Sequence, residues 1–287
     1  MIKVAQDWKD YQIIATGDGQ KLEKWGKLIL LRPDPQVIWR SQIDLDKYNG
    51  INARYIRSNK GGGAWQYLAN VPQNFTLERK GLKFSLKLMG FKHTGLFPEQ
   101  AVNWDLMQDL IKGAKRPIKV LNLFAYTGGA TVACAKVGAK VTHVDSAKAM
   151  IDRAKENISL SSINQENVRY IMDDCAKFVA REIRRGNKYD AIIMDPPSYG
   201  RGANGEVWKI EDCIFDLVKE CSKLLSEQPL FFLINSYTTG LQPTVIENIL
   251  KVNLQNLGGS FVSYEVGLPT QENDIILPCG CSGLWQK

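Results

Sequence analysis

Residues 118–145 decide the fold, and they read IKVLNLFAYTGGATVACAKVGAKVTHVD. The apolar run at 119–124 predicts a buried strand. Two consecutive glycines then open a predicted helix at 129–137, and the next strand is predicted at 140–145. A strand, a helix and a second strand in this order form a βαβ unit with parallel strands.

The same alternation continues toward the C-terminus. Further strands are expected at 167–172, 189–195, 230–235, 260–266 and 277–285, with intervening helices at about 147–160, 174–185, 210–226 and 243–257. Strands that alternate with helices of about 10–15 residues are typical of a doubly wound α/β fold. We therefore expect a Rossmann-like, mostly parallel sheet of seven strands.

Residues 1–74 follow a different pattern, in which short apolar runs are separated by turn residues. The run at 28–31, for example, lies between Gly17-Asp18-Gly19 and Pro33-Asp34-Pro35. Such runs predict the strands of a small β-rich domain. We expect this domain at 1–74, and a larger α/β domain at 75–287 that begins with a hairpin and a helix at 75–117.

The positive charge of the chain is concentrated near the N-terminus. The chain carries 37 Lys and Arg against 30 Asp and Glu, which gives a net charge of +7 and a pI near 9.0. The first 90 residues hold 15 basic and 8 acidic residues, whereas the rest of the chain holds 22 of each. Four of the seven tryptophans also lie in this first part, namely Trp8, Trp25, Trp39 and Trp65.

Basic residues interleaved with aromatic ones are typical of RNA-binding surfaces, where cations neutralise phosphates and aromatic rings stack on bases. The set here is Lys21, Lys24, Trp25, Lys27, Arg32, Trp39, Arg40, Arg54, Arg57 and Lys60. We therefore expect the small domain to place an RNA substrate. The alternative is that the tryptophans form the core of a β domain and the lysines cover its surface.

Other features exclude several classes of protein. No apolar run approaches the roughly 18 residues that a membrane-spanning helix needs, and Lys3 and Asp7 interrupt the N-terminus too early for a signal peptide. The six cysteines do not form the pairs of a zinc site or the dense pattern of a disulfide-rich domain. We expect a cytoplasmic protein with reduced cysteines and no bound metal.

Ligand-binding residues are expected where the strands end, because open α/β sheets bind ligands at the carboxyl ends of their strands. The first strand is followed by the stretch Phe124 to Gly129, where glycine allows close approach of a ligand and opens a helix whose N-terminus favours negative charge. The second strand ends at Asp145, whose carboxylate can accept both hydroxyls of a ribose. The alternative role for Asp145 is to cap the next helix.

The third and fourth strands also end in polar residues. After the third strand, one of Asp173 and Asp174 can accept a hydrogen bond from an adenine amino group while the other caps a helix, and we favour Asp174 for the adenine. The fourth strand ends in Asp195-Pro196-Pro197-Ser198-Tyr199. Because the two prolines lack backbone N–H groups, this edge presents only acceptors, which suits a base with N–H donors.

These stretches resemble the class I S-adenosylmethionine-dependent methyltransferases. They are most similar to the branch that modifies bases of large-subunit ribosomal RNA, through Phe124-Ala-Tyr-Thr-Gly-Gly129, Asp195-Pro-Pro and the segment Thr94-Gly-Leu-Phe-Pro-Glu-Gln100. The resemblance covers about residues 75–287. It implies S-adenosyl-L-methionine as the cofactor, and a segment 94–100 that lies over it.

The resemblance also implies individual roles. Phe124, Tyr126 and Gly128 would line the methionine end of the cofactor, and Asp195 and Pro196 would face the target. The implied cofactor-binding set is Thr94, Gly95, Phe97, Gln100, Phe124, Ala125, Tyr126, Thr127, Gly128, Gly129, Asp145, Ser146, Asp173, Asp174 and Asp195. The implied catalytic residues are Asp195, Pro196 and Tyr199.

The methylated atom is expected to be a nitrogen of an RNA base, with ribosomal RNA as the substrate. Enzymes that methylate C5 of cytosine need a cysteine nucleophile, and the stretches 194–199 and 234–239 contain none. A cysteine from another loop would restore that mechanism. An aromatic residue commonly follows the two prolines in amine methyltransferases, whereas Ser198 stands there in this chain. A protein side chain or a small molecule is the alternative acceptor.

Overall fold

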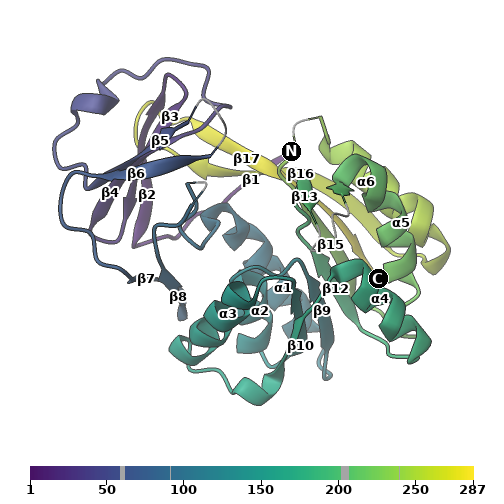
Figure 1. The fold of residues 1–287 in the computed structure, drawn as a ribbon. Helices are drawn as coiled ribbons and strands as arrows, with labels where there is room; N and C mark the ends of the chain where they lie inside the picture. The colour runs from purple at the N-terminus through teal and green to yellow at the C-terminus, as the bar shows by residue number, and fades with distance from the viewer. Residues whose placement is uncertain (59–61, 91, 202–206, 239) are drawn as a thin grey trace. The chain divides into compact units, whose positions relative to one another are not determined.

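A computed structural model describes residues 1–58, 62–90, 92–201, 207–238 and 240–287. The chain divides into two compact units (Figure 1). The large-sheet unit comprises Met1–Lys3, Asn103–Val266 and Cys279–Lys287, and the small-sheet unit comprises Val4–Val102 and Gly267–Pro278. Within the described ranges, no helix is long and apolar enough to cross a membrane.

The large-sheet unit is built on an eight-stranded sheet. Its strands, in spatial order, are β1 (Ile2–Val4), β16 (Ser260–Pro269), β17 (Ile276–Gln286), β15 (Phe231–Ser236), β12 (Ala191–Met194), β9 (Lys119–Leu123), β10 (Lys140–Asp145) and β11 (Val168–Met172). The five strands from β15 to β11 are parallel, and β17 is antiparallel to β15. The predicted doubly wound, mostly parallel sheet is confirmed.

The sheet differs from the sequence prediction at one edge. Seven of its strands match the expected ones, and the eighth is β1, at the extreme N-terminus, which we had placed in the small domain. The backbone N–H of Glu265 donates to the carbonyl of Met1 at 3.0 Å. Strand β1 has only three residues and is followed by a polar stretch, so no periodic pattern predicts it. Its partner strand β16 also lies some 260 residues away along the sequence.

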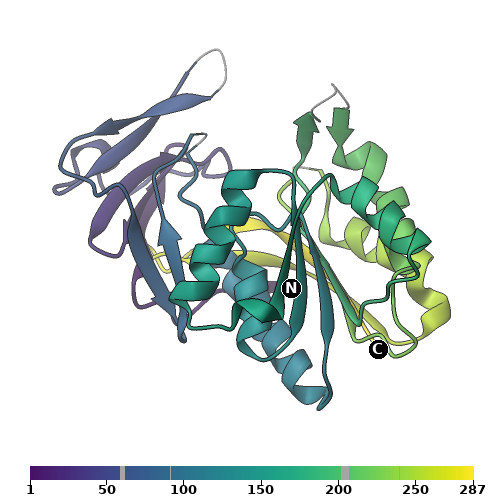
Figure 2. The ribbon, with the colours of Figure 1, turned by 60° about the horizontal axis from the view of Figure 1, so that its bottom comes forward.

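Helices cover both faces of this sheet. They are α1 (Ala101–Gly113), α2 (Gly129–Lys136), α3 (Lys148–Leu160), α4 (Cys175–Arg184), α5 (Ile210–Ser222) and α6 (Pro243–Leu254). Figures 1 and 2 show α1, α2 and α3 on one face of the sheet and α4, α5 and α6 on the other. All residues of β12 and β15 are consequently buried, as expected for parallel strands covered on both sides. The remaining short elements of this unit are η3 (Gln165–Asn167), η4 (Gln255–Leu257) and the paired strands β13 (Tyr199–Arg201) and β14 (Val207–Lys209).

The small-sheet unit is β-rich, as expected. Its five-stranded sheet has the order β2 (Tyr11–Gly17), β3 (Gln20–Trp25), β4 (Leu28–Pro33), β5 (Ala53–Arg57) and β6 (Gly63–Tyr67), and a hairpin is formed by β7 (Phe75–Arg79) and β8 (Leu82–Leu86). Two short 3₁₀ helices, η1 (Leu45–Lys47) and η2 (Pro98–Gln100), complete it. This unit extends to Val102 and includes Gly267–Pro278, so it is larger than the domain expected at 1–74.

The tryptophans of this unit pack within it and are not free stacking platforms. Trp25 is fully buried and lies edge-on to Tyr11. The indole N–H groups of Trp8, Trp39 and Trp65 donate to the Pro98 carbonyl, the Thr16 hydroxyl and the Met89 carbonyl, at 3.1, 3.1 and 2.7 Å. The alternative interpretation, that these tryptophans are structural, therefore fits the structure better than stacking on bases. Lys60 of the basic set lies outside the described residues.

Candidate active site at the carboxyl edge of the parallel sheet

The predicted ligand-binding residues of the large-sheet unit follow strands whose ends are level with one another. In the strand register, Leu123 pairs with both Val144 and Met194, and Asp145 pairs with Met172. Strand β9 lies between β10 and β12, which is the point where the strand order reverses (Figure 1). Ligands of doubly wound folds bind at this point of the sheet. The structure thus places the residues after β9, β10, β11 and β12 along one edge.

The loop after β9 has an unusual backbone. Phe124 and Tyr126 have φ angles of 53° and 50°, in the left-handed region that bulky residues rarely adopt. Each such residue costs about 1–3 kcal/mol, and strain of this kind clusters at functional sites. Two hydrogen bonds hold the loop: Ala125 N donates to the Val144 carbonyl at 3.0 Å, and Tyr126 N donates to Asp145 Oδ2 at 2.8 Å.

The two glycines that end this loop are required by packing between elements. Gly128 has a φ of 85°, and a Cβ added there would lie 3.0 Å from the Cβ of Ala154 on α3. A Cβ on Gly129 would lie 2.9 Å from the ring of Trp104 on α1. The structure shows that these glycines let α2 lie close to α1 and α3. The expected approach of their backbone to a ligand stays a prediction.

Below the loop, a buried polar chain supports α2. Thr131 Oγ1 lies 2.8 Å from His143 Nδ1 and accepts a hydrogen bond from Asn122 Nδ2 at 2.9 Å. Burial lowers the pKa of His143 to about 3, so its imidazole is neutral at physiological pH. Asn157 Nδ2 donates to the Thr127 carbonyl at 2.9 Å. These contacts fix the loop from the side of the core.

Asp145 is held by backbone donors and keeps acceptor capacity. Its Oδ2 accepts from Tyr126 N and its Oδ1 accepts from Ala147 N, at 2.8 and 2.9 Å. A carboxylate oxygen has two lone pairs, so each oxygen can accept one more hydrogen bond. Burial raises the pKa of Asp145, and these two backbone hydrogen bonds oppose that rise. The N-cap residue of α3 is Ala147 rather than Asp145, so the capping alternative does not hold. Ser146, between them, is exposed.

The two aspartates after β11 have separate partners. Asp174 is the N-cap of α4, and its Oδ1 accepts from Lys177 N at 2.9 Å. Asp173 forms an ion pair with Arg181, and its Oδ1 accepts from Asp174 N at 2.9 Å. We had assigned the cap to the aspartate that does not bind adenine. In the structure the cap falls on Asp174, the exposed residue of the pair.

In the loop after β12, only some of the backbone carbonyls are free to accept hydrogen bonds from a ligand. The Pro197 carbonyl accepts from Trp208 Nε1 at 2.6 Å, and the Ser198 carbonyl accepts from Ile210 N at 3.1 Å. Among the described residues, the Pro196 carbonyl has no hydrogen-bond partner. The open carbonyl next to the strand end is therefore that of Pro196, and the half-buried Asp195 precedes it.

Trp208 is a residue of this site that the sequence analysis missed. It lies in β14, which pairs with β13 so that Tyr199 is opposite Lys209. Its ring centroid lies 5.3 Å from that of Phe124, with 49° between the ring planes. Trp208 thus links the loop after β12 to the loop after β9, whereas Tyr199 is 51% exposed. The available signal was one aromatic residue between Val207 and Lys209, directly before a helix.

A cysteine also lies near this edge, brought there by β17. Cys281 is paired with Ser236 at the end of β15. Its thiol is buried and donates to the Leu241 carbonyl at 3.3 Å. Burial raises the pKa of Cys281 to about 11. Cys279, two residues before it, is half-buried, and all six cysteines are free thiols.

The remaining predicted cofactor residues belong to the small-sheet unit. Thr94 is buried and its hydroxyl donates to the Leu96 carbonyl at 3.5 Å. The Phe97 ring lies edge-on to His93, with 5.7 Å between centroids. Gln100 ends η2 and is buried, and Gly95 has a φ of 98°.

Comparison with known proteins identifies the family. The model of a family described as S-adenosylmethionine-dependent methyltransferase matches residues 50–228. The chain belongs to this family. The match includes the loop after β9, Asp145, the two aspartates after β11 and the loop after β12.

Curated relatives of this methyltransferase are named "Ribosomal RNA large subunit methyltransferase K/L". The protein from Shewanella frigidimarina is 34% identical over 178 residues, which cover 61% of this chain and 24% of the relative. The protein from Colwellia psychrerythraea is 25% identical over 219 residues, which cover 76% of this chain and 28% of the relative. The methyltransferase thus spans about a quarter of the length of these relatives.

Solved structures match the methyltransferase over its full length. The structure of a SAM-dependent methyltransferase from Agrobacterium tumefaciens has a TM-score of 0.93 and 32% sequence identity, and covers 100% of this chain and 93% of that one. The structure of SMU.776 in complex with SAH has a TM-score of 0.75 at 19% identity, and covers 98% of this chain and 76% of that one. The second similarity supports the fold alone.

Proposed function

We propose that this methyltransferase methylates a nitrogen of an RNA base, with ribosomal RNA as the substrate. The observation that carries the proposal is the sequence Asp195-Pro196 at the end of β12 with Trp208 of β14 next to it, since the Trp208 indole donates to the Pro197 carbonyl and its ring packs against Phe124. The names of the curated relatives support RNA as the substrate class. The positive charge concentrated in the first 90 residues supports it as well, since phosphate neutralisation gives affinity for any RNA.

Several residues of the large-sheet unit fit the cofactor, S-adenosyl-L-methionine. Asp145 has one free acceptor position on each oxygen, which suits the two hydroxyls of a ribose. Exposed Asp174 caps α4 through Oδ1 and would also accept from the adenine amino group through Oδ2, so one residue would take both roles. The loop of Phe124, Tyr126 and Gly128 would hold the methionine end. When bound, the cofactor supplies a methyl group on a positively charged sulfur, which is already a strong electrophile.

The work of the protein is then to position the nucleophile and to accept its proton. Asp195 and the Pro196 carbonyl would accept hydrogen bonds from N–H groups of the target base, which orients the nitrogen toward the methyl group. The Asp195 carboxylate would also take the proton that the nitrogen loses. Trp208 would contribute an aromatic face for the base, the role that an aromatic residue directly after the two prolines has in amine methyltransferases. Rings stacked on bases contribute about 1–3 kcal/mol each.

Methylation of C5 of cytosine is the second candidate, because β17 brings cysteines to the end of β15. A nucleophilic cysteine must be ionised. Cys281 does not meet this requirement, because its thiol is buried with a pKa of about 11. Only half-buried Cys279 remains for this role. We therefore expect Cys279→Ala to keep methyl transfer within about twofold of the natural protein, whereas a loss of about a thousandfold would establish the C5 mechanism.

The test of the proposed function is mass spectrometry of nucleosides from ribosomal RNA of cells with and without the gene. The expected result is the loss of one N-methylated base in cells that lack it. Transfer of a labelled methyl group to fractions of a cell extract separates the other acceptors. Label that resists ribonuclease but is released by protease would contradict an RNA substrate and establish a protein one.

A further inference from the structure

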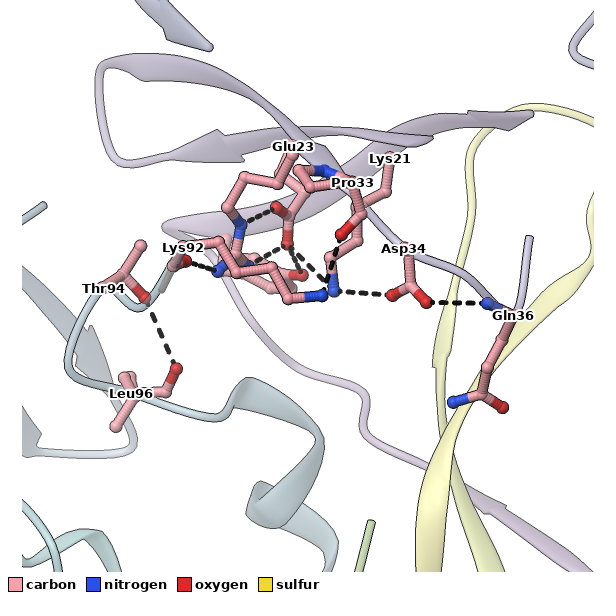
Figure 3. Close-up of polar contacts among 10 residues, drawn as sticks. Lys21, Glu23, Pro33, Asp34, Gln36, Lys92, Thr94 and Leu96 are labelled. Carbon is pink, nitrogen blue, oxygen red and sulfur yellow. Dashed lines mark hydrogen bonds and ion pairs between the residues drawn. The ribbon is translucent and has the colours of Figure 1, made fainter. Parts of the chain in front are cut away.

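A cluster of charged side chains lies inside the small-sheet unit (Figure 3). Arg32 and Glu23 form a bidentate pair, with Arg32 Nε 2.6 Å from Glu23 Oε2 and Arg32 Nη2 2.8 Å from Glu23 Oε1. Lys21 pairs with Asp34, with 3.1 Å between Lys21 Nζ and Asp34 Oδ2. These four residues therefore form two matched pairs of opposite charge.

Lys92 adds a third cation to this cluster without a carboxylate to match it. Its ammonium donates to the Pro33 carbonyl at 2.8 Å, and no carboxylate of the described residues lies within ion-pair distance of it. Its own backbone carbonyl accepts from Arg32 Nη1 at 2.8 Å, which fixes Lys92 to the cluster. Figure 3 shows Lys92 and Asp34 entering the cluster from opposite sides. The half-buried ammonium of Lys92 is thus held in place and left with surplus charge.

The surroundings of Lys92 disfavour that charge. Burial and, to a smaller extent, the cations Lys21, Arg32 and Arg57 lower the pKa of Lys92 to about 8, and Asp34 opposes them. Arg57 ends β5 and is exposed. A bound anion stabilises an ammonium in this position more than one on the open surface. The reason is that the anion offsets both the repulsion from the neighbouring cations and the free-energy cost of partial burial.

The other titratable neighbours in the described part of the chain provide no carboxylate that pairs with Lys92. Burial lowers the pKa of His93, as do Arg32 and Lys92, so His93 is neutral at physiological pH. Burial raises the pKa of Glu99, which Lys21 and Arg32 oppose, and no ion pair joins Glu99 to Lys92. Glu23 and Asp34 already have their own cations.

We propose that Lys92 binds a phosphodiester group of the RNA substrate. The choice of RNA as the source of the phosphate rests on the proposed function, whereas the anion site itself rests on the cluster. Lysine binds phosphate as a point charge, and the hydrogen bond to the Pro33 carbonyl holds the Lys92 ammonium in place for such a contact.

The first test measures how RNA binding depends on salt. Binding of a fluorescent 20-nucleotide RNA is measured by anisotropy over a range of KCl concentrations for the natural protein, Lys92→Met and Lys9→Met. Lys9 is an exposed lysine of the same unit, lies outside the basic set named above and serves as the matched control. We expect Lys92→Met to reduce the slope of log affinity against log salt by about 0.7–0.9, the value for one lost phosphate contact. A slope equal to that of the natural protein would overturn the proposal.

The second test uses pH and keeps the cation. Because the free Lys92 ammonium has a pKa of about 8, RNA affinity should fall up to about tenfold as pH rises from about 7 to about 9. Lys92→Arg should bind RNA with almost no change over this interval, since arginine stays protonated. The other charged groups facing Lys92, namely Lys21, Glu23, Arg32, Asp34, Arg57, His93 and Glu99, are common to both proteins. Identical pH profiles would contradict the proposal.

A third measurement separates the failure of this site from the failure of the proposed function. Acetylation of Lys92 by a limiting reagent is followed by peptide mass spectrometry, alone and with RNA or inorganic phosphate. Protection by RNA, together with a raised KM for RNA and an unchanged kcat in Lys92→Met, supports the site. Methyl transfer to RNA with an unchanged KM in Lys92→Met overturns the site and leaves the function. Protection by inorganic phosphate but not by RNA overturns the RNA assignment.

Discussion

Two carboxylates, Asp145 in the large-sheet unit and Glu23 in the small-sheet unit, lie in opposite kinds of site. Burial raises the pKa of Asp145, and its two backbone hydrogen bonds only reduce that rise. Burial also acts to raise the pKa of Glu23, but the charges of Arg32 and Lys21 and the hydrogen bonds from Arg32 and Tyr11 lower it to about 2. Glu23 is fully buried, whereas Asp145 is partly exposed.

The difference teaches how to separate a binding carboxylate from a structural one. Glu23 has its oxygens occupied by Arg32 and Tyr11, at 2.6 to 2.8 Å, so its binding capacity is used within the unit. Asp145 accepts only one backbone N–H on each oxygen and keeps the rest of its capacity for a ligand. Residual acceptor capacity, rather than burial, indicates function here. The predictions below test this distinction.

Removing the Asp145 carboxylate should have the largest effect on binding. Two hydrogen bonds from ribose hydroxyls to a charged group contribute about 1.5–3 kcal/mol each, so Asp145→Ala should weaken S-adenosylmethionine binding by about a hundredfold or more. Isothermal titration calorimetry measures this directly. Asp152→Ala on α3 is the matched control, because Asp152 is exposed and pairs with Lys148. Unchanged affinity in Asp145→Ala would show that the acceptor capacity of Asp145 has no role in binding.

Asp145 was predictable from sequence because it depends on local pattern. The stretch Val141 to Val144, which follows the first strand and its helix, identified β10, and the residue at its end is placed at the ligand edge by the topology of the sheet. The strands after β9 were predictable for the same reason, since burial on both faces requires apolar runs.

Contacts between segments that are distant in sequence were not predictable. The packing of Gly129 on Trp104 and the contact of Trp208 with Phe124 depend on how helices and loops meet in space. The same holds for Gly267–Pro278, which joins the small-sheet unit from the far end of the chain. Sequence pattern reports which face is buried and not which partner covers it.

Removing the Glu23 carboxylate should affect stability and leave cofactor binding unchanged. Glu23→Gln leaves the buried Arg32 guanidinium without its counter-charge, which costs about 3–5 kcal/mol in the free energy of unfolding. Urea titration measures the loss, and affinity for S-adenosylmethionine should stay within about twofold. Glu78→Gln is the control, since its ion pair with Lys83 is exposed and contributes under about 1 kcal/mol.

The contribution of Glu23 should also depend on pH in a defined direction. Its pKa is lowered from 4.5 to about 2 in the folded protein. A lowered carboxylate pKa gives stability that is present above the unfolded value and is lost as pH falls through the folded one. The natural protein should therefore lose stability relative to Glu23→Gln between about pH 4.5 and pH 2. If the free energies of unfolding of the two proteins differ by a constant amount over this interval, Arg32 and Lys21 do not lower the pKa of Glu23.

The smallest of these effects is expected at Trp208, which lies where the loops after β9 and β12 meet. Trp208→Ala should lower kcat/KM for RNA by about 10 to 100-fold, because it removes a stacking face of about 1–3 kcal/mol. Trp208→Phe separates the two functions of the indole: it keeps an aromatic face but loses the hydrogen bond to the Pro197 carbonyl. If the ring stacks on the base, Trp208→Phe should retain most of the activity. Equal losses in both variants would instead mean that Trp208 holds the loop after β12 in place. The target base would then need another aromatic partner, and the exposed Tyr199 is the nearest candidate in sequence.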